Sequence, residues 1–126
     1  MPTPKNFCDF VNPRCVSVWI GEFRSEDEFD NYLVDSFSSD FGFEIPPQAV
    51  HEIGVEPKNV DIATLVDGFS RSKTFESQVV NAAESCGISR ASCMLLIYNF
   101  AYTPAVELSA NPPIKFVGCV SFPGFE

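Results

Sequence analysis

Four carboxylates stand close together near the start of the chain, at Glu26, Asp27, Glu28 and Asp30. Two carboxylates can act as general acid and general base when a cleft drives their pKa values apart. On a helix, these four side chains would fan around the exposed side and would not converge on one point. The pattern therefore favours a solvated acidic face over a catalytic pair.

Nucleophilic chemistry would have to use one of five cysteines or the single histidine, His51. A reactive cysteine needs a neighbouring His, Lys or Arg, or a helix N-terminus, to stabilise its thiolate. The cysteines are odd in number and dispersed, with no Cys-x-x-Cys spacing, which indicates reduced thiols with no disulfide and no metal site. Cys15, Cys93 and Cys119 fall in strand patterns and are interpreted as small core residues. An enzyme that uses His51 or a cysteine is kept as an alternative.

The segment from Ser85 to Ser92 is polar enough to bind an anion. It lacks the glycine-rich loop and the lysine of a phosphate-binding loop. It is interpreted as a helix-to-strand turn.

The acidic run begins a predicted helix that follows a predicted strand. Residues 15–20 form an apolar strand pattern that contains Trp19, interpreted as a core residue, and Gly21 is expected to make the turn that follows. Ser25 and Glu28 have the spacing of a capping box, so the helix should start here and run from Glu26 to about Phe37. Apolar residues every four positions should face the core.

The rest of the chain gives a mixed pattern. Residues 40–57 are ambiguous: Phe41, Phe43 and Ile45 alternate as in a short edge strand that Pro46 and Pro47 cut off. We expect helices over residues 61–69 and 73–86, a central strand covered on both faces over 93–101, a loop over 103–113 and a last strand over 114–122. The last two strands are near in sequence, which predicts that they pair as a hairpin.

These elements do not alternate regularly, so they predict an α+β fold. We expect an irregular leader over residues 1–14 and a single domain over residues 15–126. Its sheet should be small and mostly antiparallel, with about three to five strands packed against about three helices. Thirteen phenylalanines predict a core rich in that residue.

The net charge is −9 and the isoelectric point is near 4.4. Such a chain repels nucleic acids and anionic membranes and attracts basic partners. No secretory signal is recognised at the N-terminus and no apolar run is long enough to cross a bilayer, so a cytoplasmic location is expected.

Several segments resemble the immunity protein 22 family. The first is Val16–Phe29, in which a Val-Ser-hydrophobic-Trp-hydrophobic-Gly strand leads into a Ser-Glu-rich helix. Similar segments recur in the same order at Asp40–Phe43, Leu65–Ser72, Leu96–Tyr102 and Phe116–Phe122. The resemblance implies an α+β cytosolic antitoxin of a bacterial polymorphic-toxin system, which binds and blocks a toxin domain without catalysis and without a cofactor.

The leading hypothesis is therefore a non-catalytic immunity protein that covers a basic surface of its cognate toxin, for example the cleft of a nuclease. From the residues alone we expect the contact surface to be acidic, because charged groups steer association with a basic partner. A regulatory module that binds a partner unrelated to toxins is a further alternative. The expected partner-binding residues are Glu26, Asp27, Asp30, Asp35, Asp40 and Glu44.

Overall fold

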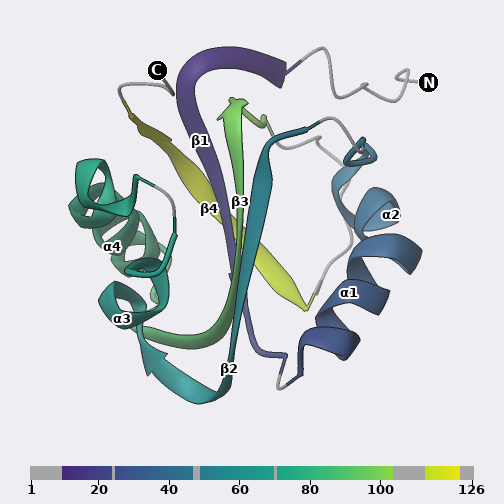
Figure 1. Ribbon diagram of the computed structural model, residues 1–126, viewed down its shortest axis with the longest axis horizontal. Helices are drawn as coiled ribbons and strands as arrows, with labels where there is room; N and C mark the ends of the chain where they lie inside the picture. Colours follow the sequence, from purple (N-terminus) through teal and green to yellow (C-terminus); the bar gives the residue numbers. More distant parts are fainter. Residues whose placement is uncertain (1–9, 24, 47–48, 70, 104–112, 123–126) are drawn as a thin grey trace.

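Four strands form one antiparallel sheet with helices on both faces (Figure 1). The computed structural model describes residues 10–23, 25–46, 49–69, 71–103 and 113–122. The expected α+β fold with a small antiparallel sheet is confirmed. In chain order the elements are β1 (Val11–Gly21), α1 (Glu26–Asp35), α2 (Phe37–Phe41), β2 (His51–Asp61), α3 (Ile62–Val66), the 3-10 helix η2 (Ser72–Thr74), α4 (Glu76–Ser85), β3 (Arg90–Phe100) and β4 (Ile114–Ser121).

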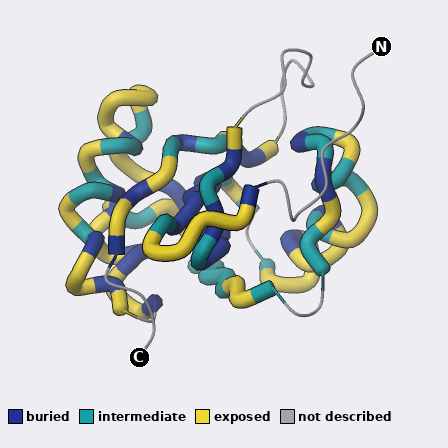
Figure 2. Tube along the Cα trace, turned by 90° about the horizontal axis from the view of Figure 1, so that it is seen from above, coloured by how far each residue is buried: buried dark blue, intermediate teal, exposed yellow. Residues whose placement is uncertain are grey.

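The sheet separates two hydrophobic cores. Helices α1 and α2 cover one face and α3 and α4 cover the other (Figure 1). The core beneath α1 and α2 is mostly aromatic, whereas the core beneath α3 and α4 is mostly aliphatic. Figure 2 shows the buried positions gathered between the two helical layers, with exposed positions on the outer sides of the helices.

Trp19 lies at the centre of the aromatic core and is fully buried. Its ring centroid is 5.5 Å from that of Phe37, 5.4 Å from that of Tyr102 and 5.2 Å from that of Phe116. Tilted and edge-on ring pairs at these distances are favourable beyond the area they bury. The predicted core role of Trp19 and the predicted phenylalanine-rich core are both confirmed.

The sheet order is β2-β3-β1-β4, so the predicted hairpin between the last two strands is wrong. β1 lies between β3 and β4 and pairs with both. The physical reason is burial: Val16, Val18 and Ile20 face the aliphatic core while Trp19 faces the aromatic one, and a strand apolar on both faces needs a central position. The expectation that the 93–101 strand is central and doubly covered is confirmed by β3.

The ambiguous segment 40–57 differs most from expectation. Phe41 ends helix α2 instead of starting a strand, and Gly42 caps that helix in the left-handed conformation with φ 83°. The strand comes later, as β2, whose residues alternate weakly because Gly54 and Pro57 interrupt the apolar pattern. Part of this segment and most of the predicted 103–113 loop lie outside the described residues.

Other boundaries shift by a few residues. The helix predicted from Glu26 to about Phe37 is two helices, with the break at Ser36. The helix predicted over 61–69 is shorter, as α3, and the one predicted over 73–86 divides into η2 and α4. Residues 11–14, expected to belong to an irregular leader, lie in β1, and residues 1–9 lie outside the described part.

Gly21 serves a different purpose from the predicted turn. It is the last residue of β1 and pairs with Ile114 at the start of β4. A Cβ at this position would lie 2.5 Å from Cγ2 of Ile114 and 2.6 Å from the carbonyl oxygen of Pro113. The glycine therefore permits close approach of two backbones rather than a turn.

At the β4 edge of the sheet, a side chain bonds backbone groups that a further strand could bond. Gln78 of α4 donates from Nε2 to the carbonyl oxygen of Ser121 at 3.0 Å, and its Oε1 accepts from the N–H of Ser121 at 3.1 Å. The amide thus bonds both backbone groups of this β4 residue, as a neighbouring strand would.

Candidate partner-binding surface

Helix α1 begins where the sequence predicts. Ser25 has an extended backbone, and its Oγ accepts a hydrogen bond from the N–H of Glu28 at 3.1 Å. The first turn carries Glu26, Asp27 and Glu28, whose charge suits the positive end of the helix dipole. Phe29 and Tyr32 face the core, so the acids are turned outward.

The charge of the molecule is divided between its two helical layers. Residues 25–45, which contain α1 and α2, hold no lysine or arginine but seven acids: Glu26, Asp27, Glu28, Asp30, Asp35, Asp40 and Glu44. Residues 62–88, which contain α3 and α4, hold three acids and two bases: Asp67, Glu76, Glu84, Arg71 and Lys73. The formal charges are therefore −7 and −1, and only the first layer presents a field of one sign.

The six sequence-predicted residues are not equivalent. Glu26, Asp27, Asp30, Asp35 and Glu44 are exposed. Asp40 is half-buried, and its Oδ2 accepts a hydrogen bond of 2.6 Å from the hydroxyl of the buried Tyr32. Burial, followed by this hydrogen bond and the charge of Asp40, raises the pKa of Tyr32 above its usual range. Asp40 therefore joins α2 to α1 in the protein itself.

Asp30 and Glu44, both exposed, line a groove of about 410 Å³ formed by α1, α2, the residues after α2 and the start of β2, and these two carboxylates are called its rims here. The lining of the groove is mixed: Leu33, Val34, Phe37 and Ile45 supply its apolar part, and Ser38 and His51 add polar groups to the two carboxylates. Val34 is 81% exposed, the highest value among the large hydrophobic residues that are exposed in the described part of the chain. Sequence reasoning missed this groove, although an apolar residue four positions after Asp30 on an acidic helix face was a usable signal.

The positions of His51 and Cys93 do not favour the catalytic roles considered for them. His51 is exposed at the start of β2, with Nδ1 3.1 Å from the carbonyl oxygen of Ala49. Cys93 is buried as predicted, and burial raises its pKa to about 11, so little thiolate forms near neutral pH.

The other cysteines differ in exposure. The predicted core position of Cys119 is wrong, because this residue is exposed on the outer strand β4. Cys15 is half-buried on β1 and Cys86 is exposed after α4. Cys8 lies outside the described residues. In the described part of the chain, no three His, Cys, Asp or Glu side chains gather as metal ligands would.

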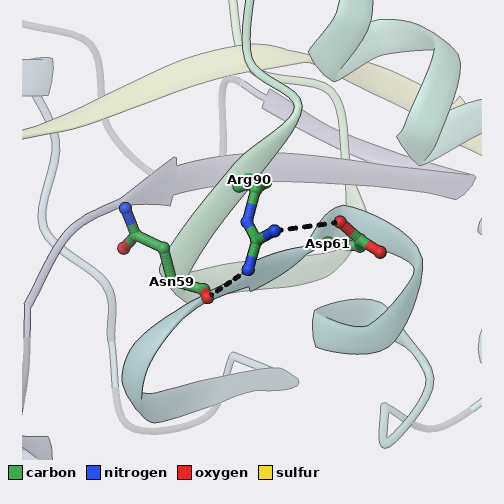
Figure 3. A network of polar contacts seen from close by, with 3 residues as sticks. All are labelled: Asn59, Asp61 and Arg90. Atoms are coloured by element: carbon green, nitrogen blue, oxygen red, sulfur yellow. Dashed lines mark hydrogen bonds and ion pairs between the residues drawn. The ribbon is translucent and has the colours of Figure 1, made fainter.

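The polar segment from Ser85 to Ser92 makes the helix-to-strand turn that was predicted. Its only base, Arg90, is engaged with β2 (Figure 3). One guanidinium nitrogen donates to the carbonyl oxygen of Asn59 at 3.0 Å, and another lies 4.0 Å from a carboxylate oxygen of Asp61. These contacts give Arg90 a structural role in joining β3 to β2.

The fold and this surface define an α+β protein with one strongly acidic helical layer and a groove of mixed lining. The sequence matches the Immunity protein 22 family over residues 16–122, and the chain belongs to that family. Membership suggests a toxin-neutralising role through binding of a protein toxin. Neither the curated proteins nor the solved structures that were compared gave a match. Among the described residues, no helix combines the length and apolar character needed to cross a bilayer.

Proposed function

We propose that this protein is a cytoplasmic, non-catalytic immunity protein that binds a cognate toxin domain of a polymorphic-toxin system through its acidic helical layer. Family membership supports the class of function. The observation that carries the proposed surface is the single-signed charge of residues 25–45, with seven acids and no base. A basic toxin surface, such as the substrate cleft of a nuclease, is the complementary partner, since carboxylates can take the positions of phosphates there.

The proposed contact residues are Glu26, Asp27, Asp30, Asp35 and Glu44, with Asp40 contributing its charge from its half-buried position. Exposed carboxylates contribute little to folding, so their removal should leave stability nearly unchanged. Their removal should instead slow association with a basic partner and reduce its dependence on salt.

The test uses a triple variant, Glu26→Gln, Asp27→Asn and Asp30→Asn. Its matched control is Asp67→Asn, Glu76→Gln and Glu84→Gln, which removes the same charge from the opposite layer. We expect the first variant to bind the toxin domain encoded next to this gene with an on-rate about tenfold lower at low salt, and to protect toxin-expressing cells less well. The control should change both quantities much less.

Two results would contradict the proposal. If the parent protein neither binds nor neutralises the neighbouring toxin domain, the proposed function is wrong. If the two triple variants behave alike, the acidic layer is not the binding surface.

A further inference from the structure

The groove between α1 and the start of β2 combines features that an acidic surface alone does not have. Its apolar lining comes from Leu33 of α1, Phe37 of α2 and Ile45 after α2, beside the polar Ser38 and His51. Its rims carry Asp30 and Glu44. Val34, 81% exposed, extends this apolar lining toward solvent.

We propose that this groove receives a cationic amphipathic segment of the toxin. One apolar side chain of the segment packs against Leu33, Val34 and Ile45, and lysine or arginine side chains on either side of it meet Asp30 and Glu44. The inference rests on the proposed function and adds to it the place of contact and the chemistry of the occupant. An apolar anchor surrounded by polar contacts is the usual arrangement of the residues that dominate protein–protein affinity.

The charge of this layer favours one of the molecules that could bind in the groove. A second copy of this chain would bring one layer of formal charge −7 against another, which opposes pairing through this face. A nucleic acid or an anionic membrane would meet the same repulsion. A protein segment with basic flanks is attracted by the rims, and its apolar residue gains burial against the walls.

The test compares an apolar change with a charge change in the full-length chain. Val34→Ser removes apolar surface at a helix position where the two residues have similar helix propensity. Val11→Ser is its matched control, because Val11 is also exposed, at 51%, but does not line the groove. The double variant Asp30→Asn with Glu44→Gln removes both rim charges. Affinity for the neighbouring toxin domain is measured at low and high salt.

We expect Val34→Ser to weaken binding about tenfold at both salt concentrations, because apolar burial is not screened. The rim variant should weaken binding by a similar factor at low salt and by much less at high salt. Val11→Ser should stay within about twofold of the parent. Hydrogen exchange in the complex should slow over residues 30–37 and 49–53 and stay unchanged over 76–85.

The proposal is overturned if Val34→Ser and the rim variant both bind like the parent, or if slowed exchange maps to α3 and α4. In either case the parent still binds toxin, so the proposed function stands and only the groove is discarded. If the parent itself does not bind the toxin domain, both proposals fail. If Val34→Ser instead separates a dimer of the parent in solution, a second copy fills the groove and the toxin-segment assignment is wrong.

Discussion

Trp19 shows what a single residue contributes to this fold. It is fully buried among aromatic rings, yet its Nε1 has no hydrogen-bond partner among the described residues. A buried donor without a partner costs about 1–3 kcal/mol. The stabilisation from Trp19 therefore comes from packing rather than from its polar atom, and Trp19→Phe should cost less than Trp19→Ala.

Cutting back one large side chain on each of the two central strands, β1 and β3, should destabilise the protein. Trp19→Ala opens the aromatic core and Leu96→Ala opens the aliphatic one, and each should lower the free energy of unfolding by about 2–5 kcal/mol. Chemical denaturation followed by circular dichroism measures this loss, with the exposed Val11→Ala as the control. Unchanged midpoints for both core variants would contradict the assignment.

Two buried tyrosines make stability depend on alkaline pH. Tyr32 donates to Asp40, and Tyr98 donates to Oε1 of Glu52 at 2.8 Å. Burial, followed by the carboxylate contact, raises the pKa of each tyrosine above its ordinary value of 10. Above pH 10 the unfolded chain releases these protons while the folded protein retains them, so the free energy of unfolding falls as pH rises.

Each tyrosine should contribute a slope approaching about 1.4 kcal/mol per pH unit above pH 10. Tyr32→Phe and Tyr98→Phe should each flatten this decline, and the double variant should flatten it further. Urea denaturation between about pH 9 and pH 11 measures the slopes, with neutral pH as the reference. A parent-like slope in both single variants would show that these tyrosines do not hold their protons in the folded protein.

At the scale of elements, local signals were the most predictive. Ser25 and the acids after it correctly placed the start of α1, because a cap is read from neighbouring residues. The continuous apolar run of β3 likewise predicted a central strand. β2 was missed because Gly54 and Pro57 weaken its alternation, and its position depends on pairing with β3, which no local pattern encodes.

The cap gives a direct test of how far α1 depends on Ser25, the residue that precedes it. Ser25→Ala should lower the free energy of unfolding by about 1 kcal/mol, since the N–H of Glu28 loses its acceptor. Ser25→Asp keeps an acceptor oxygen and should remain close to the parent. The fluorescence of Trp19, the single tryptophan, follows unfolding in urea for all three proteins. If Ser25→Ala and Ser25→Asp lowered the free energy of unfolding equally, the lost hydrogen bond to the cap would not be the cause of the destabilisation.

At the scale of the whole molecule, the sequence revealed the acidic charge of the proposed binding surface but not the groove within it. The acids were visible as a cluster in the chain, and five of the six predicted residues are exposed. The groove required four successive segments to fold against one another: α1, α2, the residues after α2, and the start of β2. The hairpin prediction failed for a similar reason, because the insertion of β1 between β3 and β4 is a long-range choice made by burial.

The clamp that Gln78 places on Ser121 gives the sheet two unlike borders. A strand arriving beside β4 would have to displace that amide at Ser121, whereas β2 forms the opposite border of the sheet among the described residues. If two molecules joined border to border through β2, the pair would present an amide-blocked β4 at each outer end. Strand addition at either outer end would then have to displace the Gln78 amide from Ser121, which opposes growth beyond two molecules.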